Sequence, residues 1–116
     1  MRESLIYKIA EAEAWAAAES LGRFDGAPID LADGYIHFST AAQLAETAAK
    51  HFAGRDGLVL VAVDADALGD ALVYEPSRGG ALFPHLYGPL LVSAVRSVRP
   101  IVRDADGRAI LPEASA

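Results

Sequence analysis

Leu58-Val59-Leu60-Val61-Ala62-Val63-Asp64 is the stretch that decides the fold. Its six consecutive apolar residues, three of them β-branched, are typical of a short strand that is buried on both faces. This is also the longest apolar run in the chain, and a transmembrane helix needs about 20 such residues. The run therefore predicts a buried strand and gives no sign of a membrane span.

Two strand-and-helix units precede this strand. Residues 5–9 predict a first strand, and residues 11–21 predict a helix that stops at Gly22. Residues 35–39 predict a second strand, and Thr40 with Gln43 three residues later is a capping-box signature for a helix to about residue 53. The inner stripe expected for this second helix consists of Leu44, Ala48, His51 and Phe52. Residues 23–34, rich in glycine, proline and aspartate, predict a loop.

Mostly strands are expected after residue 64. Residues 71–75 predict a strand, 83–87 an edge strand or ordered loop because of Pro84, and 95–102 a strand with an edge or break at Pro100. Residues 104–107 predict a turn that returns through 109–111. We therefore expect one α+β domain over 1–116, with a short C-terminal hairpin or tail at 101–116. Its two early helices pack on a largely antiparallel, twisted sheet.

Composition narrows the class of protein. The 116 residues contain no cysteine, 53% hydrophobic residues and a formal net charge of −6. Disulfides, thiolate zinc sites and cysteine nucleophiles are excluded, and the apolar content argues against disorder. The charged N-terminus is not typical of a signal peptide, so we expect a cytoplasmic protein.

The charge is unevenly distributed. Residues 76–103 contain no acidic residue and four arginines, Arg78, Arg96, Arg99 and Arg103. These arginines lie either on the solvated face of a strand or around a site for a small anionic ligand. The acidic whole disfavours nonspecific nucleic-acid binding, although RNA stays open as a partner.

His37 is the first candidate for chemistry. In an extended strand Tyr35, His37 and Ser39 share one face, and the strand runs directly into the helix start at Thr40, where free N–H groups favour an anion. The alternative is a half-exposed strand histidine without a functional role.

A second group follows the strand at 71–75. Glu75, Ser77, Arg78 and Gly79 combine a carboxylate, a hydroxyl, a guanidinium and a backbone that a ligand can approach closely. The alternative is a Gly-Gly turn with a surface Glu–Arg pair.

A third group consists of Phe83, His85 and Tyr87, which share one face of an extended segment. They form either an aromatic cradle for a planar ring or a structural cluster that covers the sheet. Lys8 lies on the opposite face of its strand from Tyr7, toward solvent or toward a cleft. His51 is interpreted as structural. The three histidines share no metal-ligand spacing, so no metal site is expected.

Together these motifs resemble a bacterial family known only as domain of unknown function 952. The resemblance covers about residues 5–100 and rests on segments 6–9, 15–22, 33–40, 51–52, 75–80 and 83–88, in that order. The family has no established activity. It is in turn similar to the ADP-ribosyltransferase superfamily, in particular to the NAD-using RNA 2′-phosphotransferases.

That similarity implies an ADP-ribosyltransferase-like fold and NAD as cofactor. His37 then matches the superfamily's second-strand histidine. Lys8 takes the first-strand position, where many relatives have histidine, and a lysine is charged and only donates. Tyr74 stands where relatives often have tryptophan. Glu75 is the only acid in the shared motifs of the second half, and the superfamily's catalytic glutamate has no secure match.

Three functions stay open at this point. The first is an NAD-using transferase in which Arg78 and the glycine amides bind phosphate and Phe83 or Tyr87 stacks on a ring. His37 would bind a ribose hydroxyl, and Glu75 would stabilise positive charge or act as a base. The second is a noncatalytic ligand-binding or interaction module. The third is a small hydrolase that uses Glu75 and His85. The substrate and the oligomeric state are left open.

Overall fold

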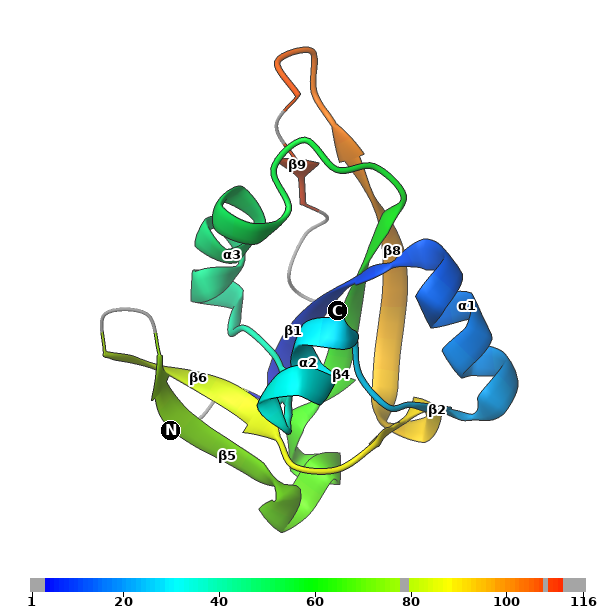
Figure 1. Cartoon of the computed structure of the whole chain (residues 1–116), viewed down its shortest axis with the longest axis vertical. Helices are drawn as coiled ribbons and strands as arrows, with labels where there is room; N and C mark the ends of the chain where they lie inside the picture. Colours follow the sequence, from blue (N-terminus) through cyan, green and yellow to red (C-terminus); the bar gives the residue numbers. More distant parts are fainter. Residues whose placement is uncertain (1–3, 78–79, 108, 112–116) are drawn as a thin grey trace.

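The predicted buried strand lies at the centre of the main sheet. A computed structural model describes residues 4–77, 80–107 and 109–111. In it β4 (Leu58–Asp64) lies between β1 (Leu5–Glu11) and β8 (Val95–Arg103) and is antiparallel to both (Figure 1). β8 also pairs with β9 (Ala109–Ile110) through its last two residues. The mixture of helices with antiparallel sheets confirms the α+β class.

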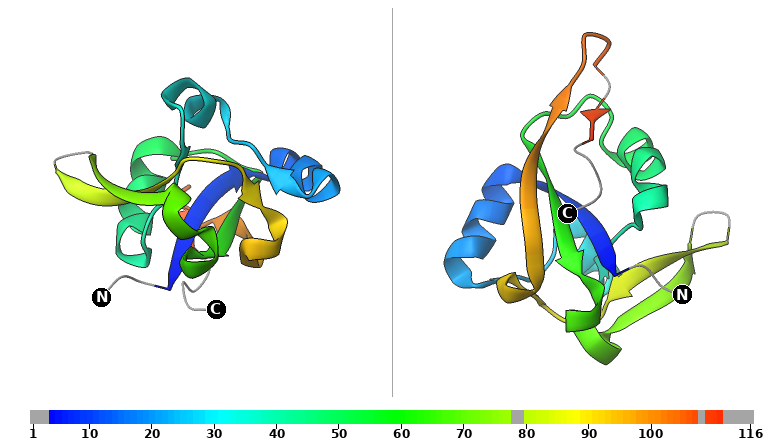
Figure 2. Two further views of the ribbon diagram at one scale, coloured as in Figure 1. Left: turned by 90° about the horizontal axis from the view of Figure 1, so that it is seen from below. Right: turned by 180° about the vertical axis from the view of Figure 1, so that it is seen from behind.

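Alternate residues of β4 pack into two separate cores. Val61 and Val63 enter the larger core, whereas Leu60 and Ala62 enter the smaller one. Helix α1 (Ala12–Leu21) contributes to the larger core and α3 (Leu44–His51) to the smaller, so the two early helices cover opposite faces of the sheet (Figure 2). This is why an uninterrupted apolar run, rather than an alternating one, is stable here.

Helix α1 carries the only tryptophan of the chain. Trp15 is 2% exposed, and its ring centroid lies 5.6 Å from that of Phe24. The helix ends as predicted at Gly22, whose φ of 91° is readily adopted by glycine.

A second, three-stranded sheet has β6 (Ala81–Leu86) between β3 (Ile36–His37) and β5 (Leu72–Ser77). The prediction of an edge strand or loop around Pro84 is therefore wrong. Pro84 lacks an N–H, but its carbonyl still accepts a hydrogen bond from Phe38 N–H (3.0 Å), so the strand keeps its central place. Backbone bonds between Tyr7 and Ser39 (2.8 Å in each direction) join this sheet to β1.

Residues 23–34 are not the loop that their composition predicts. They form the short strand β2 (Arg23–Phe24), which pairs with β7 (Leu90–Leu91), and the helix α2 (Pro28–Asp33). Pro28 occupies the first turn, and the Asp30 side chain accepts the N–H of Ala27 (2.7 Å) at the helix start. Gly34, with φ 89°, ends the helix.

The second predicted helix begins with a 3₁₀ turn (Ala41–Gln43) and continues as α3. The Thr40 N–H donates to Gln43 Oε1 (3.0 Å), as the capping-box signature predicts. His51 is exposed, so its assignment to the inner stripe is wrong. Leu44, Ala48 and Phe52 do pack into the smaller core, as predicted for the inner stripe.

The remaining elements are short 3₁₀ turns at Ala65–Ala71 and Val92–Ala94 and the C-terminal hairpin. β8 runs through Pro100 without a break, and Gly107 adopts the positive φ expected of the turn. No helix in the described part of the chain is long and apolar enough to cross a membrane.

Candidate functional site

Two pockets of the described structure lie near the predicted site residues, and the larger has a volume of about 650 Å³. Its walls come from β1, β3, α3 and β6, and from the segment that precedes α2. Pockets of roughly 300–1,000 Å³ are typical of small-molecule sites. The pocket therefore lies where the main sheet meets the three-stranded sheet, next to the motifs that the sequence singled out.

Two histidines on neighbouring strands line this pocket. His37 of β3 lies opposite His85 of β6 in the antiparallel register, and their ring centroids are 5.5 Å apart. The sequence predicted both residues as candidates in separate motifs, and strand pairing brings them together.

A carboxylate holds His85. The Nδ1 atom of His85 lies 2.8 Å from Glu75 Oε1. The side chain is 3% exposed, and the ring of Tyr35 stacks on it with the ring centroids 4.1 Å apart. Tyr87 O–H also donates to Glu75 Oε1 (2.7 Å). The hydrogen bonds from Tyr87 and His85 lower the pKa of Glu75, and the bond to Glu75 raises the pKa of Tyr87 to about 12.

Asp30 is a buried centre of hydrogen bonding that the sequence did not reveal. Its carboxylate accepts from Lys8 Nζ (2.9 and 3.1 Å), from the backbone N–H of His37 (3.1 Å) and from that of Ala27. It also lies 2.6 Å from His37 Nδ1. Burial alone would raise the pKa of Asp30, but the bond from His37 and the charge of Lys8 lower it to about 2.

Lys8 points inward, which settles the alternative left by the sequence. It is 6% exposed, and its ammonium group forms the ion pair with Asp30. Burial lowers the pKa of Lys8, and the attraction of Asp30 opposes this effect. The cation therefore lines the pocket with its charge already balanced.

Asp33, at the end of α2, completes the surroundings of His37. Its Oδ2 lies 2.9 Å from His37 Nε2, and its side chain is 42% exposed. Because Asp30 holds the other nitrogen, both ring nitrogens of His37 face carboxylates. Pro28 followed two residues later by Asp30 is typical of a helix start. A helix that begins at Pro28 places Asp30 and Asp33 one turn apart.

The other predicted site residues fall into three groups. Ser39 and Phe83 are buried and line the pocket, and the Ser39 hydroxyl shares a hydrogen bond with Thr47 (2.8 Å). Thr40 and Tyr87 are not among the residues that line it. Arg78, Gly79 and the side chain of Ser77 lie outside the described residues.

Two arginines of the basic segment are paired with carboxylates and do not line the larger pocket. Arg96 donates to Asp64, and Arg103 donates twice to Asp56 (2.8 Å each). The bond from Arg96 lowers the pKa of Asp64. These contacts support the solvated-face interpretation for Arg96 and Arg103. At the pocket itself, Arg55 forms an ion pair with Glu11 (2.7 Å), and no motif in the sequence pointed to this residue.

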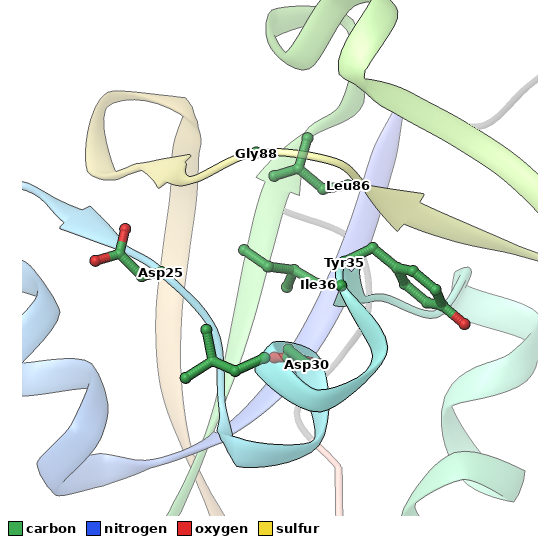
Figure 3. A pocket seen from close by; sticks show the side chains of 8 residues that line it. Asp25, Asp30, Tyr35, Ile36, Leu86 and Gly88 are labelled. Carbon is green, nitrogen blue, oxygen red and sulfur yellow. The ribbon is translucent and has the colours of Figure 1, made fainter.

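The second pocket is smaller, about 210 Å³, and Asp30 and Tyr35 are among the residues that line it (Figure 3). Asp25, Ile36, Leu86 and Gly88 also line it, and neither histidine does. No cluster of three or more metal-ligating side chains occurs in the part of the chain that the structure describes. We therefore take the larger pocket as the candidate site.

The fold and the site define a small α+β domain with a carboxylate-held histidine pair at a pocket of ligand size. The model of the family described as "Protein of unknown function (DUF952)" matches residues 9–98, and the chain belongs to this family. The family predicted from the motifs is thereby confirmed.

Solved structures of one relative share the fold. The crystal structure of protein CC0527 from Caulobacter crescentus is 55% identical, covers 91% of this chain and 93% of that chain, and superposes with a TM-score of 0.88. The solution NMR structure of the same protein is 55% identical over 91% of each chain, with a TM-score of 0.82. No curated protein matches the chain.

Proposed function

We propose that this protein is an enzyme that transfers a group from a nucleotide-like small molecule in the larger pocket, with His85 as general base. The His85–Glu75 pair is the observation that carries this proposal. A carboxylate at Nδ1 fixes the ring proton there and leaves Nε2 to accept a proton, as in Ser-His-Asp triads. His85 has this arrangement and lines the pocket.

The lining of the pocket supports a nucleotide-like ligand. Tyr7, Phe52 and Phe83 offer aromatic surface for a planar ring, and Ser39 and His37 offer polar atoms for ribose hydroxyls. NAD is the first ligand to test, because the resemblance to NAD-using RNA 2′-phosphotransferases implies it as the cofactor.

The contacts around the pocket support roles that differ in part from those predicted from the sequence. Glu75 acts through His85 as a positioning residue, because it bonds to the ring and is not among the lining residues. Lys8 serves to hold Asp30, since its charge is already paired. Phosphate binding by Ser77, Arg78 and Gly79 and ring stacking by Tyr87 stay predictions.

The test follows nicotinamide release from NAD at millimolar concentration, with and without added acceptor alcohols. We expect His85→Ala to lower the rate on the order of 100-fold or more, as for loss of a general base. Glu75→Gln should give an intermediate rate, and Glu46→Gln, on an exposed ion pair of α3, should match the wild type.

The outcomes separate the open functions. Release that needs an acceptor supports the transferase, and release into water alone supports the hydrolase, for which the same His85–Glu75 pair would activate water. A rate unchanged by His85→Ala contradicts the proposal. A rise in melting temperature with NAD but no turnover favours the noncatalytic module.

A further inference from the structure

We propose that His37 is the general acid opposite His85, and that the bond broken here has an oxygen leaving group, as in a phosphodiester beside a free hydroxyl. This inference rests on the proposed role of His85 as base and assigns the second proton transfer of the same site. It also names the substrate class more narrowly.

The first support is the placement of the two rings. His37 and His85 are cross-strand neighbours on one wall of the pocket, with centroids 5.5 Å apart and planes inclined by 70°. The rings therefore do not stack on one another, and one ligand lying across the strands can meet both.

The second support is that the two rings have different hydrogen-bond partners. His85 has a carboxylate at Nδ1. His37 has carboxylates at both nitrogens, Asp30 at 2.6 Å and Asp33 at 2.9 Å. An ionised carboxylate only accepts, so in this arrangement both nitrogens of His37 donate. One ring is set to take a proton and the other to give one, which is how acid and base roles are divided in enzymes.

The groups around His37 preserve this difference. Asp30 and Asp33 come from α2, Lys8 from β1, His85 from β6 and Tyr35 from the residues before β3. Asp30 is held in place by its ion pair with Lys8, whereas Asp33 is partly exposed. A ligand oxygen can therefore replace Asp33 at Nε2 without disturbing the buried pair.

The reaction balances without an oxidant or reductant. His85 Nε2 takes the proton of the substrate hydroxyl, whose oxygen forms a bond to phosphorus. The bond from phosphorus to the leaving oxygen breaks, its electron pair stays on that oxygen, and His37 supplies the proton. Nicotinamide leaves NAD as a neutral molecule and needs no such proton. Glycosidases direct two carboxyl groups at the bond, whereas Asp30 and Glu75 here face the histidines.

Two probes test the assignment. The first is a ribodinucleoside monophosphate, which has an alcohol leaving group, and the second is a nucleoside 3′-(p-nitrophenyl phosphate), whose leaving group departs without a proton. We expect His37→Ala to lower the rate on the first probe on the order of 100-fold and on the second less than about 10-fold. Added imidazole should restore part of the lost rate, which separates a missing proton donor from a damaged fold. Glu46→Gln again serves as the control.

The failures are distinguishable. Equal losses on both probes, no rescue by imidazole, or no cleavage of either ester by the wild type overturns the assignment of His37. Release of nicotinamide from NAD by the wild type and by His37→Ala at equal rates, with His85→Ala inactive, overturns the oxygen leaving group and leaves His85 as base. Equal rates for His85→Ala and the wild type overturn the proposed function itself.

Discussion

At the scale of single residues, Asp30 links the parts of the site. One carboxylate binds Lys8 on β1, the backbone before α2 and both the ring and backbone of His37. Neither of its side-chain partners is a neighbour in sequence. The alternation of residues 35–39 predicted which face His37 takes, but not the carboxylate that would hold it, because that contact depends on the folding of α2.

Replacing Asp30 by asparagine should lower the free energy of unfolding at pH 7 by about 3 kcal/mol or more. The substitution leaves the ammonium group of Lys8 buried without its counterion, and breaking a buried pair from one side typically costs about 3–5 kcal/mol. Urea unfolding followed by circular dichroism measures the change.

Two further variants check the cause. Lys8→Met combined with Asp30→Asn should recover part of the loss, because no unpaired charge is then buried. Asp25→Asn removes an exposed ion pair with Arg23 and should change stability by less than about 1 kcal/mol. A loss in Asp25→Asn equal to that in Asp30→Asn would contradict the explanation.

At the scale of elements, helix ends were predicted best, because the residues next to a helix end determine where it stops or starts. The stop of α1 at Gly22 and the cap of α3 at Thr40 follow from nearby residues. The composition of residues 23–34 predicts a loop because glycine, proline and aspartate are typical of turns, but Pro28 and Asp30 also fit the helix start that α2 has. Pro84 predicts an edge position for β6 because proline lacks an N–H, but β6 is central because the Pro84 carbonyl still accepts a hydrogen bond.

The glycines on either side of α2 should respond differently to alanine. Gly34 has φ 89° and open space where a Cβ would lie, so Gly34→Ala should cost only about 1 kcal/mol of backbone strain. At Gly26, with φ 126°, a Cβ would lie 2.9 Å from that of Asp30. Gly26→Ala should therefore be clearly more destabilising and should weaken ligand binding, measured by urea unfolding and ligand titration. Equal losses would show that the packing of Gly26 against Asp30 is unimportant.

At the scale of the whole molecule, the α+β fold class could be predicted from the sequence, but the pairing of the strands could not. The apolar run at 58–63 predicted a buried strand, but its partners β1 and β8 lie far away in the sequence. The meeting of His37 with His85 depends on the same kind of long-range register. Strand pairing of this kind is decided by the complete core, which no local pattern describes.

Stability of the whole domain should fall in acid. Hydrogen bonds and nearby charges lower the pKa values of Asp30, Asp64 and Glu75. A carboxyl group whose pKa is lower in the folded state stabilises the fold above its unfolded pKa, and this contribution is lost as the pH falls through the folded pKa. For Asp30 the fall from 3.8 to about 2 corresponds to about 2 kcal/mol, lost between roughly pH 4 and pH 2.

Urea unfolding at a series of pH values between 7 and 2 measures this loss. The free energy of unfolding of Asp30→Asn should decline less than that of the wild type between roughly pH 4 and pH 2. The same decline in both proteins would mean that Asp30 does not cause it.

The contact between Trp15 and Phe24 has a practical consequence. Phe24 lines the larger pocket and lies against the only indole of the chain. A ligand that shifts Phe24 will change the intrinsic fluorescence of Trp15, whose emission has no competing tryptophan. The protein therefore contains its own optical reporter, with which candidate ligands can be screened unlabelled before any reaction is known.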